Sequence, residues 1–599
     1  MRKKSAEPVL LTFDLMVAKI ASMPSGIDWK RDCFSENELE IMQRNLHELA
    51  NKEHEVLIIG GGIYGAAAAW DASLRGLSVA LIEKGDWGGA TSSNSLKIIH
   101  GGLRYLQHAD FKRMRESIRE RMILMRIAPH LVHPLPCAMP TYGHAMKGKE
   151  VMAIAMFMND LIGFDRNGLQ DPQKRLPAGR VISKKECLDL IPGIDASGLT
   201  GGAVWYDCHV YNSERMLLSY LHAAARNGAR LGNYLEVTGF IVKNQRVLGV
   251  RVRDAMTQNE FEIRARLVIN NSGPWVNQTL GLFDQKKSDK KVLLSKAMNL
   301  ILRRQVIPQY AVGVPSKFEF KDSDAIINKG SRLLFIRPWR DRSMVGTTHV
   351  AYEGEPKDFR VTESDIQTFI DEVSAAYPAA NLSRADVAFF NGGLLPMESV
   401  NPRTGDVRLL KHYIMRDHEP EHGLAGLLTV VGVKYTTARD VAAKSIDVAM
   451  HKLGLAFKPS LGASTPVHGG NIERFDDYMR TETQRKPHAL SEKTTKHLIE
   501  NYGTAYHEVL HHGAQDRTLL QPVAANTEVL RAEIMHGIRE EMALKLSDVV
   551  MRRTELGSAG HPGEAALQTC AKIMGEELQW SAKRVREELA EVEAVYVPA

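Results

Sequence analysis

The segment that most constrains the fold of this chain is VLIIGGGIYG at residues 56–65. Its four leading apolar residues are typical of a strand buried on both faces, and AAAAW, which begins a helix, follows the last glycine. Glycine at positions 60, 62 and 65 permits a tight turn, close approach of the backbone to a pyrophosphate, and close packing of helix on strand. The helix N-terminus adds free N–H groups and partial positive charge. The segment therefore predicts a dinucleotide site.

A second strand, LSVALIEK, supports this prediction because it ends in Glu83, 21 positions after Gly62. A carboxylate at this spacing is expected to accept hydrogen bonds from the adenosine ribose. The stretch that follows, KGDWGGATSSNSLKIIHGGLRYLQ, is dense in Gly, Ser and Thr, and we expect it to line the cofactor groove. A glycine turn alone is a weak signal, but the ordered set of strand, turn, helix, strand and acid predicts an α/β dinucleotide-binding domain.

Charge and cysteine content narrow the functional classes. The formal charge of +6 is small for 599 residues, so it does not indicate nucleic acid and fits an anionic substrate or an anionic membrane surface equally well. The five cysteines (Cys33, Cys137, Cys187, Cys208 and Cys570) are scattered without CxxC spacing. This pattern argues against a disulfide framework or a zinc site and predicts a reducing compartment.

Two apolar or basic segments leave membrane contact open. No apolar run approaches the roughly 20 residues that span a bilayer. The arginine-rich helix expected at 109–128 is interpreted as a solvated face or as a contact with anionic lipid. The Met-rich helix expected within 145–165 is interpreted as core packing, as insertion at a membrane surface, or as a quinone-facing element. Residues 1–53 are expected to form an extension with a polar helix near its end.

The rest of the chain alternates strands and helices. RLVINNSGPWVNQTLG predicts a buried strand that enters a turn, and residues 292–350 predict an antiparallel sheet over the cofactor. Thr362 and Asp365 are spaced for a capping box. LLTVVGVKYTTARDVAAK predicts strand, glycine turn and helix, with the helix N-terminus directed at Gly60. Beyond a linker, KPSLGASTPVHGG, residues 471–599 are helical by pattern, and REEMALKLSDVVMRRTELG is amphipathic.

Four ordered strings identify a resemblance to a known family. SLKIIHGGLRYLQ (residues 95–107) resembles SKLIHGGLRYLE of the FAD-dependent glycerol-3-phosphate dehydrogenase and oxidase family. GTTHVAYEGEP is similar to its GTTDVEYKGDP, VVGVKYTTARDVA to its FGGKLTTYRKLA, and IREEMALKLSDVVMRRTELG to its helical C-terminal domain. The resemblance is collinear from about residue 54 to the end.

The resemblance implies an α/β fold, α+β overall, in several parts. These are an FAD-binding Rossmann-like domain of the glutathione-reductase type, an antiparallel-sheet substrate domain and a helical C-terminal domain. The implied boundaries are an extension over 1–53, an oxidoreductase core over 54–460 and the helical domain over 461–599. Within the core, FAD-binding parts cover about 54–290 and 385–460, and the substrate sheet about 291–384.

The implied activity is oxidation of sn-glycerol 3-phosphate to dihydroxyacetone phosphate, with hydride transfer to FAD and electrons passed to quinone. The alternatives are an FAD-dependent oxidase, a dehydrogenase of another hydroxy or amine substrate, and a non-catalytic flavoprotein scaffold. The expected partners are a small-molecule substrate and a quinone, without nucleic acid, and a homodimer is left open. The expected location is the cytoplasm, with peripheral attachment to the inner face of the inner membrane left open.

The resemblance also assigns roles to residues of this chain. Arg104 and Tyr105 match the family's substrate contacts, Lys434 matches the Lys of its late Gly–Lys motif, and His100 is a candidate to lie near the flavin. Arg104, Lys434 and His100 are the catalytic candidates; Lys411 and His412 are further substrate-binding candidates. The cofactor-binding candidates are Gly60, Gly62, Ile63, Tyr64, Gly65, Glu83, Lys84, Thr91, Ser92, Ser95, Lys97, His100, Gly101, Val237, Ser272, Gly273, Trp275, Gly393, Gly432, Lys434, Tyr435 and Thr436.

One departure concerns the substrate. Where the family has SGVRPL, with an Arg at the substrate, this chain has GGLLPM, which places Leu395 at that Arg. A later substrate Arg of the family aligns with Lys411, which keeps the charge but not the planar fork. YDCHVYNSERM also departs from the family's DDARL. His412, Arg337 and His349 are the candidate replacements for the missing cation.

Overall fold

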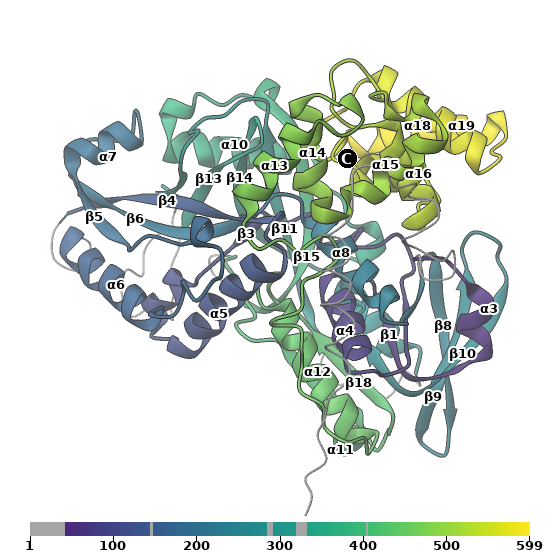
Figure 1. The fold of residues 1–599 in the computed structure, drawn as a ribbon. Coiled ribbons are helices and arrows are strands. Elements are labelled where there is room, and N and C mark those ends of the chain that lie inside the picture. Colours follow the sequence, from purple (N-terminus) through teal and green to yellow (C-terminus); the bar gives the residue numbers. More distant parts are fainter. Residues whose placement is uncertain (1–41, 144–147, 284–290, 319–331, 403–404) are drawn as a thin grey trace, which may run out of the picture. The chain divides into compact units, whose positions relative to one another are not determined.

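The computed structural model describes residues 42–143, 148–283, 291–318, 332–402 and 405–599 (Figure 1). The side chains of Arg104, Gln107 and Gln515 lie outside this description, as does most of the extension predicted over 1–53. The described end of that extension contains helix α3 (Leu46–Asn51), which is followed by strand β1 (Glu53–Ile59). The helix prediction is therefore confirmed where the chain is described, and the first strand begins three residues before Val56.

The first sheet is built around β1, as the glycine segment predicts. Its order in the described chain is β17-β18-β10-β1-β2-β7, and the hairpin β8–β9 joins it through β10. The pairs that β1 makes with β10 and β2 are parallel. The strands are β2 (Val79–Ile82), β7 (Arg230–Gly232), β8 (Leu235–Lys243), β9 (Arg246–Asp254), β10 (Glu260–Asn270), β17 (Ile414–Asp417) and β18 (Leu427–Val431).

Small side chains let three helices pack closely beside this sheet. Helix α4 (Ile63–Leu74) follows the glycine turn and packs against α8 (Ser213–Arg226) and α12 (Ala438–Lys452). The run of alanines at 66–69 is fully buried, because a methyl group allows neighbouring helix backbones to approach where a larger side chain would separate them. As the sequence predicts, α12 follows strand β18 and a short turn.

The second sheet is mainly antiparallel and is wider than the predicted range of 291–384. Its order in the described residues is β16-β15-β11-β14-β13-β12-β4-β6-β3, with β5 on β6. Strands from residues 98–210 and 387–409 therefore join those from 293–352. The strands are β3 (Ile98–Ile99), β4 (Val132–Tyr142), β5 (Arg180–Ser183), β6 (Leu199–Val210), β11 (Leu293–Leu302), β12 (Ala311–Pro315), β13 (Leu333–Trp339), β14 (Arg342–Tyr352), β15 (Val387–Val400) and β16 (Val407–Leu409).

Helices border this second sheet. Helix α10 (Glu363–Ala376) begins with the predicted capping box: the Thr362 hydroxyl accepts from the Asp365 N–H at 3.2 Å, and the Asp365 carboxylate accepts from the Thr362 N–H at 2.8 Å. The arginine-rich segment forms α5 (Phe111–Ile127), and the Met-rich segment forms α6 (Lys149–Ile162). The shorter helix α7 (Lys184–Leu190) packs on β5 and β6, whereas α9 (Val276–Gly281) follows β10 and α11 (His418–His422) packs on β18 of the first sheet.

The C-terminal region is helical, but REEMALKLSDVVMRRTELG is not one continuous helix. Helix α16 (Arg531–Glu540) ends there, Met542 takes a positive φ of 56°, and α17 (Leu546–Asp548) continues into a wider π-turn over Val549–Arg553. The break is stabilised by Asp548, whose carboxylate accepts from the Leu544 and Lys545 N–H groups. The other helices are α13 (Phe475–Arg485), α14 (Glu492–Tyr502), α15 (Tyr506–Gln515), α18 (Glu564–Glu577) and α19 (Ala582–Val595).

Candidate functional site

The glycine turn has the close approaches that a dinucleotide loop requires. Gly60 has a φ of 107°, and a Cβ on it would lie 2.5 Å from the Asn271 carbonyl oxygen. A Cβ on Gly65 would lie 1.9 Å from the Gly60 carbonyl oxygen. Gly62 is the N-cap of α4 and has no side chain that could occupy the N–H groups at the helix end, where an anionic group would bind. The Ser92 hydroxyl accepts from the Ile63 N–H at 3.0 Å and brings the Ser/Thr stretch to this turn.

Glu83 holds the loop at the end of β2. Its carboxylate accepts from the Gly61 N–H at 2.7 Å and from the Gly85 N–H at 2.9 Å. Burial raises the pKa of this carboxyl, and the two N–H donors oppose that shift by favouring the charged form. The Glu83 carboxylate therefore links the glycine turn to the loop that follows β2, where the sequence places the ribose contact.

A cavity of about 490 Å³ adjoins this loop. Lys84 and Trp275 both line this cavity, and the Lys84 ammonium lies 3.6 Å from the centre of the Trp275 ring. The Thr91 hydroxyl donates to the Leu394 carbonyl at 2.9 Å. Gly393 lies against Thr91, so the Ser/Thr loop contacts the second sheet. The lining includes Glu83, Lys84, Gly85, Asp86, Thr91, Asn94, Trp275, Asn391, Gly393, Ser547, Met551 and Arg552.

A second cluster brings together predicted residues that are 329 positions apart. The Lys434 ammonium lies 4.1 Å from the centre of the Tyr105 ring. Burial, together with the nearby cation of Arg113, lowers the pKa of Lys434, whereas contact with Tyr105 opposes that shift. The Tyr64 hydroxyl donates to the Lys434 carbonyl at 2.7 Å, which fixes the late Gly–Lys turn to the first turn of α4. The cluster therefore adjoins the dinucleotide turn.

Sequence reasoning missed Arg113 in this cluster. Its guanidinium lies 4.2 Å from the centre of the Tyr105 ring and 3.3 Å from the Asp110 carboxylate. Its Nε atom is buried and has no hydrogen-bond partner among the described residues. His412 also approaches Asp110, at 3.8 Å. We interpreted the arginines of 109–128 as a solvated or lipid-facing set; the cue to this contact was the position of Arg113 at the start of that helix, eight residues after Tyr105.

His100 is paired with a carboxylate that sequence reasoning also missed. Its Nδ1 atom lies 3.5 Å from Asp207, and its side chain is 46% exposed. Asp207 accepts from the Gly101 N–H at 2.5 Å and from Arg121 at 2.8 Å. Burial alone would raise the pKa of Asp207, but contacts with His100, Arg121 and the Gly101 N–H lower it to about 2. The cue was the Asp of YDCHVY, the segment noted above as a departure from the family.

Other predicted residues have different surroundings. The Lys97 ammonium is buried and donates to Glu214 at 2.8 Å and to Ser213 at 2.6 Å. The Tyr435 hydroxyl donates to the Ser213 carbonyl at 2.9 Å. Arg337 is fully buried and donates to the carbonyls of Leu96 and Lys97, and its other terminal nitrogen contacts His209, so its guanidinium is already occupied. Leu395 lies on β15, paired with Ser295 of β11.

The remaining predicted residues border these groups. Gly432 lies against the Tyr64 ring, Ser95 accepts from the Lys97 N–H, and Ser272 donates to Asn270. Gly273 begins a short 3₁₀ helix, Val237 lies on β8, His349 on β14, and Thr436 is buried just before α12. Arg104 lies in the 3₁₀ helix Leu103–His108, and its side chain is outside the description. Lys411 lies in the bend before β17 and also has an interaction partner.

The donor set fits a flavin dinucleotide. The open end of α4, the glycine backbone and the Glu83 carboxylate match a pyrophosphate and its neighbouring ribose. Gly60, Gly62, Ile63, Gly65, Glu83 and Lys84 are the residues that would hold this end of the group.

Comparison with known proteins matches this geometry. A family model described as "FAD dependent oxidoreductase" matches residues 55–433, and one described as "C-terminal domain of alpha-glycerophosphate oxidase" matches residues 460–585. A glycerol-3-phosphate dehydrogenase of Synechocystis is 29% identical over 90% of this chain and 95% of its own length. The mitochondrial glycerol-3-phosphate dehydrogenase of Mus musculus is 31% identical over 90% of this chain and 72% of its own length.

A solved structure shares the fold. The glycerol-3-phosphate dehydrogenase from Bacillus halodurans, complexed with FAD, superposes with a TM-score of 0.71 at 22% identity. The match covers 92% of this chain and 95% of the other. The two sheets and the helical C-terminal region therefore form a fold already seen with bound FAD.

Proposed function

The chain belongs to the FAD-dependent glycerol-3-phosphate dehydrogenase family, and from this premise we propose how its own residues act on the substrate. It oxidises the secondary hydroxyl of sn-glycerol 3-phosphate to the ketone of dihydroxyacetone phosphate. Bound FAD supplies the acceptor for the hydride that leaves the substrate carbon. The protein must therefore bind the phosphate, orient the carbon and accept the hydroxyl proton.

The main support for the proposed substrate site is the contact between Lys434 and the Tyr105 ring beside the glycine turn. Lys434 and Arg113 both approach the Tyr105 ring, and they place two cations within reach of one anionic group. Arg113, at the start of α5, supplies the planar fork that suits phosphate, which Leu395 does not. Arg104, from the same segment, is the third cation of the proposed phosphate site.

His100 is the proposed base that accepts the hydroxyl proton. One ring nitrogen faces the ionised Asp207 carboxylate, which orients the imidazole and stabilises the charge that develops on it. The half-exposed ring leaves the other nitrogen available to substrate.

The kinetic test is the variant His100→Gln, because glutamine retains a hydrogen-bonding group but does not accept the proton. We expect kcat to fall by about 10²–10⁴, the range for general base catalysis, while FAD content is unchanged. A kcat within a few-fold of wild type would overturn the role of His100. Asp207→Asn is the companion variant and should lower kcat in the same direction.

The proposed electron acceptor is a membrane quinone, reached through helix α6. Ile154, Phe157 and Leu161 follow one face of α6, and their side chains are 64%, 66% and 56% exposed. Helix α6 packs against α5 and against the 3₁₀ helix that carries Tyr105. Helix α6 therefore lies beside the element that carries Tyr105, and its exposed apolar face is the proposed contact with the membrane that holds the acceptor.

Helix α6 would lie on the membrane and not cross it. Among the described residues, no helix is long and apolar enough to span a bilayer. The 14 residues of α6 extend about 21 Å, less than the roughly 30 Å hydrocarbon core. We accordingly propose peripheral attachment at the cytoplasmic face of the inner membrane; the homodimer stays a prediction, and light scattering of the purified protein would test it.

A further inference from the structure

The loop that follows Glu83 is attached to the C-terminal helical region. Asp86 lies three residues after Glu83, and its side chain is 1% exposed. The Arg553 guanidinium donates to both carboxylate oxygens of Asp86, at 2.6 and 2.7 Å. Burial by itself would raise the pKa of Asp86, but the guanidinium groups of Arg553 and Arg552 hold it below its usual range. The carboxylate is therefore ionised, buried and neutralised across 467 positions of sequence.

The β7–β8 turn strengthens this attachment. The Tyr234 N–H donates to the Gly85 carbonyl at 2.9 Å, and the Tyr234 hydroxyl donates to Asp548 of the C-terminal region at 2.7 Å. The neighbouring Asn233 amide donates to the Met542 carbonyl at 2.9 Å. Loop 83–86 is thus connected to the C-terminal region directly and through this turn.

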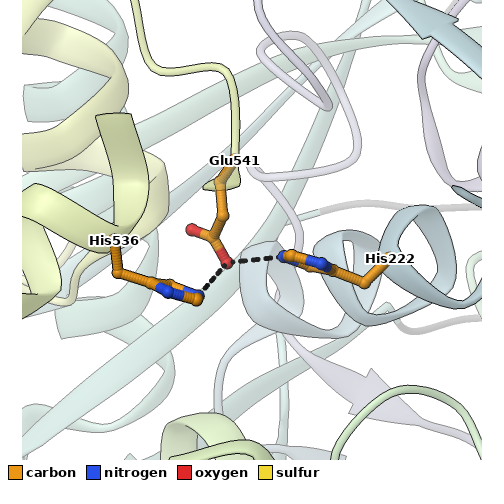
Figure 2. A group of neighbouring side chains, drawn as sticks. All are labelled: His222, His536 and Glu541. Atoms are coloured by element: carbon orange, nitrogen blue, oxygen red, sulfur yellow. Dashed lines mark hydrogen bonds and ion pairs between the residues drawn. The ribbon is translucent and has the colours of Figure 1, made fainter. Parts of the chain in front are cut away.

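A buried group of charged side chains anchors the same region to helix α8. Figure 2 shows that His222 and His536 approach one carboxylate oxygen of Glu541, at 3.1 and 3.5 Å. Two imidazoles and a carboxylate are a common donor set for a divalent cation. Here, however, Arg215 donates to both oxygens of Glu541, at 2.7 and 2.8 Å, and already neutralises its charge. The group is an ion-pair contact between α8 and the C-terminal region.

The cavity wall gives this contact a role in cofactor binding. Glu83 and Gly85 line the same cavity as Ser547, Met551 and Arg552 of the C-terminal region. We propose that Arg553 and Arg552 are positioning residues of the FAD site, which hold Glu83 in place through Asp86 and thereby couple FAD binding to docking of the C-terminal region. This proposal rests on Glu83 being the ribose contact. Because such coupling is reciprocal, bound FAD also holds the C-terminal region more tightly.

The test is FAD titration of the apoprotein, followed by flavin fluorescence. Arg553→Met should weaken FAD binding on the order of 5- to 150-fold, the usual range for coupled sites. Arg553→Lys keeps the charge without the fork and should recover part of that loss. The matched control is Arg539→Met, which removes an exposed pair with Glu577 in the same region and should bind FAD as wild type does.

A double-mutant cycle and a wild-type measurement complete the test. Asp86→Asn should weaken FAD binding, and adding Arg553→Met to it should cost little more. Hydrogen exchange of wild-type amides at 549–553 should slow when FAD binds, a readout that needs no variant to fold. Unchanged exchange, or an Arg553→Met protein that binds FAD as tightly as wild type, would overturn the proposal. Failure of wild type itself to bind FAD would instead contradict the proposed function.

Discussion

At the scale of single residues, the substrate site depends on which cations face the Tyr105 ring. The arginine that the family resemblance leads one to expect is Leu395 in this chain, on a strand paired within the second sheet. Arg337 is committed to backbone carbonyls. Arg113 has a buried Nε atom without a hydrogen-bond partner in the described chain. Its guanidinium lies over the Tyr105 ring, which Lys434 also contacts. We therefore propose that Arg113, at the start of α5, binds the phosphate in place of the arginine that the family has at the position of Leu395 on β15.

Replacing Arg113 tests this account. Arg113→Met should raise KM for glycerol 3-phosphate about tenfold or more, because a charge-assisted hydrogen bond contributes about 1.5–3 kcal/mol. The control is Arg115→Met, two positions along the same helix, where the guanidinium pairs with Asp165 instead. Steady-state kinetics of both variants decide the point. Equal KM values for Arg113→Met and Arg115→Met would show that Arg113 does not bind the phosphate.

The lowered pKa of Lys434 gives a pH dependence of defined sign. A lysine whose folded pKa is lowered loses its charge at a lower pH than an ordinary lysine, whose pKa is about 10.4. KM should therefore be lowest where Lys434 is charged and should rise as pH increases through the lowered pKa. Lys434→Arg remains charged throughout, so its KM should stay level over the same range. A rise of equal size in both proteins would show that another group titrates.

At the scale of elements, the local sequence pattern was sufficient to predict a strand or helix whose residues alone determine it. The parallel strands around the glycine turn, the capping box of α10 and the helices of the C-terminal region were all predicted from the sequence. The break after α16 was not predicted. It depends on the Asp548 carboxylate, which accepts from the Leu544 N–H, and on Met542, which takes a positive φ. A continuous amphipathic pattern does not record that turn.

The exposed face of α6 is testable as an element. Wild-type protein should float with phosphatidylcholine vesicles at low and high salt, since apolar insertion is not screened by salt. Phe157→Asp should reduce vesicle binding about tenfold, because burying a phenylalanine contributes about 1.5–3 kcal/mol. Phe457→Asp is the matched control, at 69% exposure on another segment. Vesicle binding that disappears in high salt, or that Phe157→Asp leaves intact, would contradict insertion by α6.

At the scale of the whole molecule, the candidate site is made by contacts that cross long stretches of chain. The sequence indicated the cofactor turn and the two motifs that supply Tyr105 and Lys434. The cues to Arg113 and Asp207 were weak, because the local pattern around each is that of an ordinary helix or strand; only the folded chain brings Arg113 to Tyr105 and Asp207 to His100. The link from Asp86 to Arg553 spans most of the chain and likewise has no local signature.

The central claim is that this chain reduces its flavin with glycerol 3-phosphate. The most direct measurement is anaerobic mixing of the purified holoenzyme with millimolar sn-glycerol 3-phosphate while the visible flavin absorbance is followed. We predict rapid bleaching with this substrate and none with glycerol, which lacks the phosphate that Arg113 and Lys434 are proposed to bind. A flavin that stays oxidised with glycerol 3-phosphate would contradict the account.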